Sequence, residues 1–187
     1  MLLDEWRRRL GRWIAAYPVA LTVIAVLLAP AVMPVLQPAV YAQIYGKNGS
    51  AGAGDSYGLP QNLADRFGWE QQVALIAQVY HGLPANERRV ACIVTSNYGE
   101  AAALVQFGGH YHLPEPISGH NAFYIWGPQG CSGQVLITIN IAQKDATQAY
   151  SSVTLAAQTS CAACVDYENH ASILILRQPK VPFSVLW

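Results

Sequence analysis

The sequence predicts an α/β protein in which a small, mostly parallel sheet carries helices on both faces and is preceded by one transmembrane helix. Short apolar runs rich in β-branched residues alternate with helix-like segments in the second half of the chain. This alternation is typical of parallel strands joined by crossover helices. A long uncharged apolar stretch lies near the N-terminus. The remainder of the chain beyond that stretch has the size of one domain.

The apolar stretch from Ile14 to Leu36 is almost wholly aliphatic, and no Asp, Glu, Lys or Arg occurs from Trp13 to Gly46. A bilayer is crossed by roughly 20 apolar residues in helical form. Arginines at positions 7, 8, 9 and 12 precede the stretch, whereas only Lys47 follows it closely. The positive-inside rule therefore places the N-terminus in the cytoplasm. A cleaved signal peptide is the main alternative, because residues 40–42 fit a cleavage site, but the length of the run favours a retained anchor.

These features divide the chain into four parts. We expect a cytoplasmic basic flank over 1–12, a transmembrane helix over 13–41, a flexible glycine- and serine-rich linker over 42–58, and an extracytoplasmic α/β domain over 59–187. The protein would then be a single-pass protein of the cell membrane with membrane lipid as a partner. The charged fraction is 12% and the net charge is zero. A nucleic-acid partner is therefore not expected.

Within the domain, apolar periodicity predicts the elements in order. A helix is expected to follow Gly68 and to end at Gly82 and Pro84, because apolar residues at 73, 76, 77 and 80 have helical spacing. The elements expected after it are a buried strand over 90–96, a helix over 100–107, a strand over 134–141, a polar helix over 144–150, a short strand over 153–157 and a buried strand over 172–177. The segment 97–99 turns the first of these strands directly into a helix.

Four cysteines lie in the outer part, where disulfides are permitted. We expect at least one disulfide among Cys131, Cys161 and Cys164, with Cys92 reduced and buried in its strand. The pair Cys161 and Cys164 is compatible with a redox pair, half of a zinc site or a structural bridge. Zinc is the poorest of the three because no second CxxC occurs. No metal and no cofactor is expected.

Three polar clusters are candidates for ligand binding: TSNYGE over 95–100, SGHN over 118–121 and DYENH over 166–170. The candidate ligand-binding residues within them are Asn97, Tyr98, Glu100, His120, Asn121, Glu168 and Asn169. For the first cluster, capping of the following helix is favoured over binding of an anion at its N-terminus. For the second, a satisfied core histidine is the alternative, and for the third it is a solvated loop.

We also expect the turn Asn97 to Glu100 and the loop Ser118 to Asn121 to line one pocket. The helix over 100–107 returns the chain to the opposite edge of the sheet, and an extended piece near Tyr111 to Leu113 would bring it back. A right-handed crossover puts the following loop on the same edge as the first turn.

Four segments carry a resemblance to a known family: LPQNLADRFGWEQQVALIAQVYHGLP, ACIVTSNYGEAAAL, FGGHYHLPEPISGHNAFYIWGPQGC and SCAACVDYENHASILILR. Together they resemble the C-terminal extramembrane domain, with the last membrane helix, of bacterial protein-mannosyltransferase-type (family 39 type) membrane glycosyltransferases. SNYGEAAAL and SGHN are the most specific parts. Such enzymes transfer a sugar from a polyprenyl-phosphate carrier, using acidic residues on an early loop of a polytopic membrane body.

The resemblance implies a non-catalytic domain that aids acceptor or carrier recognition, with a polyprenyl-phosphate sugar and a polytopic body or partner beside it. This chain contains no counterpart of the membrane body, so no catalytic residue is assigned and enzyme activity stays open. The alternative is a self-standing, membrane-tethered ligand-binding or assembly module. A thiol-disulfide enzyme built on Cys161 and Cys164 is weaker, because that pair does not follow a strand and open a clear helix.

Overall fold

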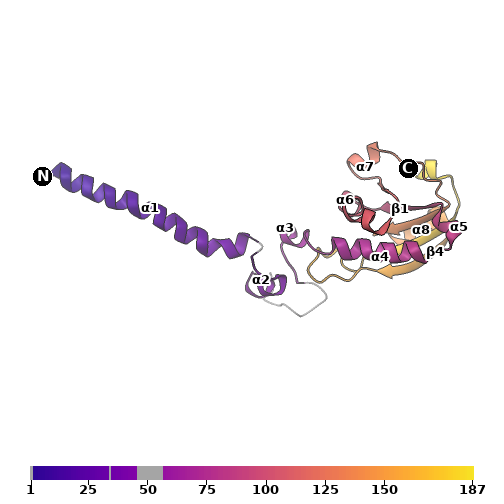
Figure 1. Ribbon diagram of the computed structural model, residues 1–187, viewed down its shortest axis with the longest axis horizontal. Coiled ribbons are helices and arrows are strands. Elements are labelled where there is room, and N and C mark those ends of the chain that lie inside the picture. The colour runs from indigo at the N-terminus through magenta and orange to yellow at the C-terminus, as the bar shows by residue number, and fades with distance from the viewer. Residues whose placement is uncertain (1, 34, 46–56) are drawn as a thin grey trace.

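The computed structural model describes residues 2–33, 35–45 and 57–187. The elements are α1 (Leu2–Val32), α2 (Pro38–Tyr45), α3 (Gln61–Ala64), α4 (Trp69–Gly82), α5 (Ala85–Arg88), β1 (Ala91–Thr95), α6 (Tyr98–Phe107), η1 (Gly108–Tyr111), β2 (Pro116–Ser118), α7 (Ala122–Ile125), β3 (Val135–Ile139), α8 (Gln143–Ala149), β4 (Tyr150–Gln158), β5 (Ser172–Pro179) and α9 (Phe183–Leu186). Figure 1 shows the strands gathered in the part of the chain that follows α3. Most of the predicted linker, residues 46–56, lies outside the described residues.

The N-terminal apolar region forms two helices rather than one. α1 contains Pro18 and Pro30 and ends at Val32, and α2 begins with Pro38 as its first residue. Proline is accepted in the first turn of a helix because its missing N–H would have no partner there. A transmembrane helix was expected over 13–41, and within the described ranges no helix is both long and apolar enough to cross a membrane.

The sheet has five strands in the order β2-β1-β3-β5-β4. β1 pairs in parallel with β2 and with β3, whereas β5 pairs antiparallel with both β3 and β4. The α/β class is confirmed, but the prediction of a mostly parallel sheet is wrong. The chain between β4 and β5 forms only turns, and a parallel pair needs a crossover of a dozen or more residues that is usually helical. A connection without a helix is typical of antiparallel neighbours, which is how β4 and β5 pair.

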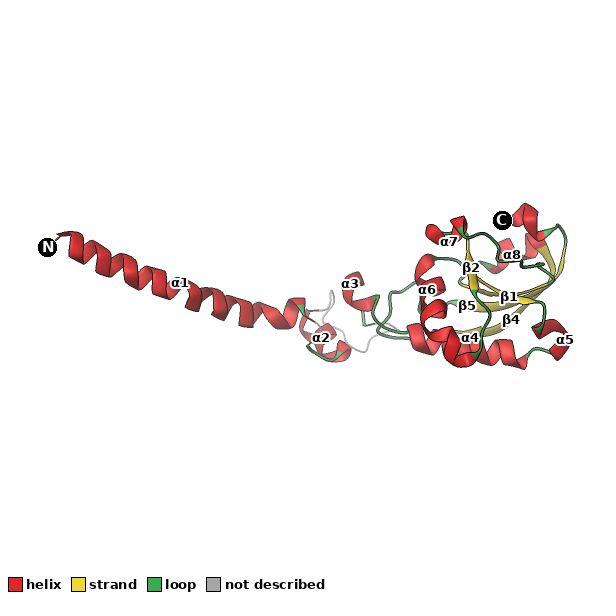
Figure 2. Ribbon diagram, turned by 45° about the horizontal axis from the view of Figure 1, so that its top comes forward, coloured by secondary structure: helices red, strands yellow, loops and turns green. Residues whose placement is uncertain are grey.

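Helices cover the two faces of the sheet separately. On one face, Val73 and Ile76 of α4 and Leu104 of α6 pack with the buried isoleucines 93, 137, 139 and 173. On the other face, Ala146 of α8 and Phe183 of α9 pack with Leu136 and Leu174. In Figure 2, α4 and α6 lie together on one side of the strands. Burial of β-branched residues on both faces explains why β1 and β3 are continuous apolar runs.

The connections of β1 and β3 create a topological switch point. β1 leads through α6 to β2 on one side, and β3 lies on its other side and leads into α8 on the opposite face. In open α/β sheets a crevice forms beyond the carboxyl ends of two strands whose connections diverge in this way. The topology therefore indicates the ends of β1 and β3 as the place to look for a site.

Two disulfides cross-link the domain and leave no described cysteine free. Cys161 bonds to Cys164, as expected for a bridge among the last three cysteines. Cys92 bonds to Cys131 with a Cα–Cα distance of 6.0 Å, so the prediction that Cys92 stays reduced is wrong. β1 is not covered completely on the face that carries Cys92, which is only half-buried. The loop after α7 can therefore bring Cys131 against the strand.

Candidate functional site

A crevice of about 760 Å³ opens beyond the carboxyl ends of β1 and β3. Its walls come from the turn after β1, the end of β3, the helix α6, the loop after β2 and the segment before α4. The lining residues are Gln61, Asp65, Trp69, Ser96, Asn97, Tyr98, Gly99, Ala102, Ala103, Gln106, Phe107, His120, Asn140 and Tyr167. The crevice therefore lies where the switch point of the sheet predicts a ligand site.

The turn after β1 and the loop after β2 meet in this crevice. The rings of Tyr98 and His120 pack edge to face with their centroids 5.2 Å apart, and both side chains are exposed. The Ser118 hydroxyl donates a hydrogen bond of 3.1 Å to the Thr95 carbonyl. The predicted proximity of these two segments is confirmed.

The route that brings the loop there differs from the prediction. Residues 111–113 are not extended, because the 3-10 helix η1 runs through Tyr111 and His112 adopts a left-handed backbone. The returning strand is β2, whose Ser118 pairs with Thr95 at the carboxyl end of β1. Parallel pairing puts the ends of both strands at one edge, so the SGHN loop reaches the crevice as expected.

The first turn of α6 is closed by its own side chains. The Asn97 side chain accepts from the Glu100 amide at 3.0 Å, and the Glu100 carboxylate accepts from the amides of Ser96 at 2.8 Å and Asn97 at 3.2 Å. This is a capping box, the arrangement that the three-residue spacing of Asn97 and Glu100 favours. The capping interpretation is confirmed. The amides of Ser96, Asn97 and Glu100 are therefore occupied by side chains of the same turn.

Glu100 was predicted to line the crevice. It is fully buried instead and does not face the crevice. Its Oε1 and Oε2 also accept from the Ser96 hydroxyl, at 3.2 and 3.1 Å. Burial, and next the negative charge of Glu168, raise the pKa of Glu100 from its ordinary 4.5 to about 7. Burial has the larger effect on this pKa, because a carboxyl that loses its hydration is less stable in the charged form.

Glu168 is the second buried carboxyl behind the crevice, with 5% of its surface exposed. Asn97 Nδ2 donates to Glu168 Oε1 at 3.0 Å, and Gln72 Nε2 donates to Glu168 Oε2 at 2.9 Å. The solvated-loop interpretation of DYENH is therefore wrong for this residue. Asn97 holds the two buried carboxyls in one network, and this network fixes the wall of the crevice that Asn97 forms.

The remaining predicted residues lie beside the crevice. Asn121 has a left-handed backbone at the start of α7, makes no capping bond there and is not among the residues that line the crevice. Asn169 uses its side-chain oxygen to accept from the Cys161 amide at 2.9 Å. These two residues shape the loops behind His120 and around the Cys161–Cys164 disulfide, and they do not face a ligand in the crevice.

Sequence reasoning missed several lining residues, above all Trp69, Asn140 and Tyr167. Asn140 follows β3 directly, has a left-handed backbone and donates to the Tyr167 carbonyl at 3.1 Å. A polar residue at the end of the second parallel strand is a usable signal, because both strand ends meet at one edge. Trp69 and Tyr167 carry no such signal, since they come from outside the parallel part of the sheet.

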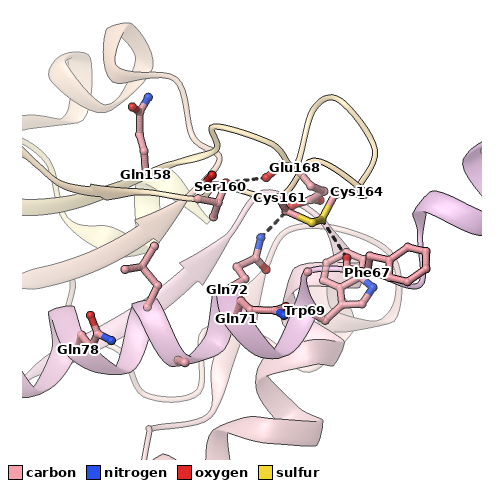
Figure 3. A pocket seen from close by; sticks show the side chains of 14 residues that line it. Phe67, Trp69, Gln71, Gln72, Gln78, Gln158, Ser160, Cys161, Cys164 and Glu168 are labelled. Atoms are coloured by element: carbon pink, nitrogen blue, oxygen red, sulfur yellow. Dashed lines mark hydrogen bonds between the residues drawn. A yellow bond between two sulfur atoms is a disulfide. The ribbon is translucent and has the colours of Figure 1, made fainter. Parts of the chain in front are cut away.

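A second, smaller hollow of about 390 Å³ adjoins the crevice at Trp69. It lies between α4 and the segment that follows β4, and Figure 3 shows Gln72 pointing from α4 toward Glu168 and the Cys161–Cys164 disulfide. The disulfide packs on Gly68, where an added Cβ would lie 2.2 Å from Cys164 Sγ. Gly68 also has a φ of 90°. A side chain is therefore excluded at the residue that starts α4 and orients Trp69.

Searches against family models, curated proteins and solved structures found no match to this chain. Among the described residues, no group of three or more His, Cys, Asp or Glu side chains is placed to hold a metal ion. The chemistry of the crevice itself is thus the basis for a function. It combines aromatic rings with amide and hydroxyl groups, and Asp65 is its one acidic lining residue, with no Lys or Arg.

Proposed function

We propose that residues 59–187 form a non-catalytic recognition domain that binds the sugar part of an acceptor or carrier in the crevice, as the C-terminal portion of a polyprenyl-phosphate-sugar-dependent membrane glycosyltransferase. One observation carries this proposal. The two segments with the most specific resemblance to the family 39 type, SNYGE and SGHN, come from different strands and meet in one crevice through Tyr98 and His120.

The lining of the crevice supports a sugar rather than a phosphate as the bound group. Phosphate is normally held by Arg or Lys side chains or by free amides at a helix start. Among the described residues that line the crevice there is no Arg or Lys, and three amides at the start of α6, those of Ser96, Asn97 and Glu100, already bond to side chains of the turn. Aromatic faces beside amide side chains suit a sugar ring, which offers an apolar face and hydroxyl groups at its edge.

The location at a membrane, outside the cytoplasm, is part of the same proposal. The arginines before the apolar stretch support this orientation. Side chains of α1 such as Ile14, Val26 and Leu27 are more than 60% exposed, which leaves an apolar surface without protein cover. The two disulfides support an oxidising compartment for the domain.

The test measures sugar binding to the full chain in detergent micelles. Saturation-transfer NMR detects the binding, and the ligands are the methyl glycosides of mannose, glucose and galactose. We expect at least one of them to bind, and Tyr98→Ala or His120→Ala to weaken it about three- to tenfold, since an aromatic contact contributes about 0.5–1.5 kcal/mol. Tyr124→Ala is the matched control. Tyr124 is about as exposed as Tyr98 but stacks on Trp187 outside the crevice. Equal loss in the control, or no binding of any glycoside, would contradict the proposal.

The second candidate is a self-standing, membrane-tethered binding module. It is supported by the way the crevice is built, since its walls come from several elements of one domain and Tyr98 and His120 meet within it. Co-purification from membranes separates the two candidates. A polytopic partner that accompanies the chain supports the glycosyltransferase, whereas sugar binding by a chain that purifies without one supports the independent module.

A further inference from the structure

The hollow beside the crevice is lined by uncharged hydrogen-bonding groups. Four glutamines contribute to it, Gln71, Gln72 and Gln78 from α4 and Gln158 from the end of β4, together with Thr159 and Ser160. Figure 3 shows that these residues come from two facing sides, α4 and the chain around the end of β4. Glu168 is the one ionisable side chain of the lining, and both of its oxygens already accept hydrogen bonds. Most of the polar groups in the lining are therefore neutral amides and hydroxyls.

Trp69 belongs to both the hollow and the crevice. Its indole N–H donates to the Asp65 carbonyl at 2.6 Å. Its ring lies against Gly99, where an added Cβ would be 3.1 Å from Cη2. The ring is thus held between the start of α4 and the start of α6. It forms a shared apolar wall with a polar space on each side.

The polar network behind Trp69 also continues from one space to the other. Gln72 and Glu168 line the hollow, and Asn97, which donates to Glu168, lines the crevice. Gln72 is 4% exposed, and its Oε1 has no hydrogen-bond partner within the described part of the chain. A buried acceptor without a donor costs about 1–3 kcal/mol.

From these contacts we propose that the crevice and the glutamine-lined hollow are two subsites of one site, which binds adjacent units of an uncharged oligosaccharide on either side of Trp69. This inference rests on the proposed function, which requires only that a single sugar occupies the crevice. The second subsite extends it to a ligand of at least two sugar units. Amide side chains satisfy sugar hydroxyls without charge, and the Trp69 ring offers each unit an apolar contact.

The test compares methyl glycosides of mannose, glucose and galactose with the corresponding di- and trisaccharides, by calorimetry on the full chain in detergent micelles. We expect a disaccharide to bind at least tenfold more tightly than its monosaccharide. Gln71→Ala combined with Gln78→Ala should abolish this gain and leave the affinity for the methyl glycoside unchanged. Both glutamines are exposed, so the double variant is expected to fold.

Gln143→Ala is the matched control, because Gln143 is an exposed glutamine of α8 that lines neither space. It should bind every sugar as the parent chain does. Equal affinity for mono- and disaccharides, or an unchanged disaccharide affinity in the double variant, overturns the second subsite while the proposed function stands. Absence of binding for every sugar overturns both.

Discussion

The two ends of the central strands β1 and β3 are held by different chemistry. At the amino end lie the Cys92–Cys131 disulfide, the Tyr150 hydroxyl bonded to the Gly133 carbonyl at 2.8 Å, and the paired Arg177 and Glu87. At the carboxyl end, two buried carboxyls are linked through Asn97 behind an open crevice. The first end is cross-linked by groups that satisfy one another, beside a hollow of about 440 Å³ that Cys92 and Cys131 help to line. The second leaves polar groups facing a space that a ligand can enter.

This difference implies that the amino end mainly contributes stability and that the carboxyl end mainly contributes ligand binding. A change at the amino end should lower stability and leave ligand affinity of the folded protein intact. A change at the carboxyl end should alter affinity, or its dependence on pH, with a smaller cost in stability. Proteins commonly place binding groups on a scaffold whose rigidity comes from elsewhere.

The largest loss of stability is expected from Cys92→Ala combined with Cys131→Ala. The bridge spans 39 residues, and closure of a loop of that length restricts the unfolded chain by about 4 kcal/mol at 25 °C. Urea unfolding of the non-reduced proteins measures the loss. Sugar affinity measured well below the unfolding midpoint should equal that of the parent chain. A loss of sugar affinity in the folded variant would contradict the prediction that the amino end contributes stability without affecting binding.

The next effect concerns the protonation of Glu100, whose pKa is about 7 in the folded chain against the ordinary 4.5. Because the folded-state pKa is raised, the protonated form stabilises the fold below pH 4.5, and this stability is lost as the pH rises from about 4.5 to about 7. The loss is at most roughly 3 kcal/mol, from 1.36 kcal/mol per pKa unit. Glu100→Gln keeps the shape and cannot ionise, so its stability should not fall over this range.

Unfolding at pH 5 and pH 8 measures this difference, and Glu87 at the other end supplies a comparison whose contribution to stability is constant over that range. The hydrogen bond and charge of Arg177 hold the pKa of Glu87 below its ordinary value. Its stabilising effect is therefore present above the unfolded pKa and lost as the pH falls through the lowered pKa. A Glu100→Gln variant that follows the same pH profile as the parent chain would refute the role given to burial.

A smaller loss is expected from Cys161→Ala combined with Cys164→Ala. This bridge spans only 3 residues, so loop closure contributes about 2 kcal/mol. The disulfide packs on Gly68 next to Trp69, and its removal should loosen the wall shared by the two subsites. We expect sugar affinity to fall several-fold in calorimetry. Unchanged affinity would show that α4 orients Trp69 without the bridge.

The smallest effect should come from Arg177→Met at the amino end. The guanidinium donates to both oxygens of Glu87, at 2.9 and 2.7 Å, but both side chains are partly exposed. Partly exposed ion pairs contribute about 0–1 kcal/mol. Urea unfolding in low and high salt measures this, and sugar affinity should be unchanged. Solvent screening makes this ion pair the weakest of these contributions to stability. A loss of stability larger than that caused by removal of the Cys161–Cys164 bridge would contradict this expectation.

Local sequence patterns predict the structure correctly where local physics decides it. The strands over 90–96, 134–141 and 172–177 appear as β1, β3 and β5, because β-branched apolar runs fit a sheet buried on both faces. The capping box follows from the spacing of Asn97 and Glu100 alone. The meeting of Tyr98 with His120 follows from the rule for parallel crossovers, although the returning strand is β2 rather than residues 111–113.

Tertiary structure decided the features that depend on residues far apart in the chain. The pairing of Cys92 with Cys131 and the burial of Glu168 between Gln72 and Asn97 join positions 39 to 96 residues apart. The direction of β5 likewise depends on its pairing with β3 and β4. An apolar run such as SILILR has the same pattern in either strand direction, and an acidic loop residue is expected to be solvated until its partners are known. The sequence alone therefore determined strands β1, β3 and β5, the cap of α6 and the edge of the sheet where the site lies. Which side chains face that site was decided by packing between distant segments, because burial and hydrogen-bond partners arise only once the sheet has assembled.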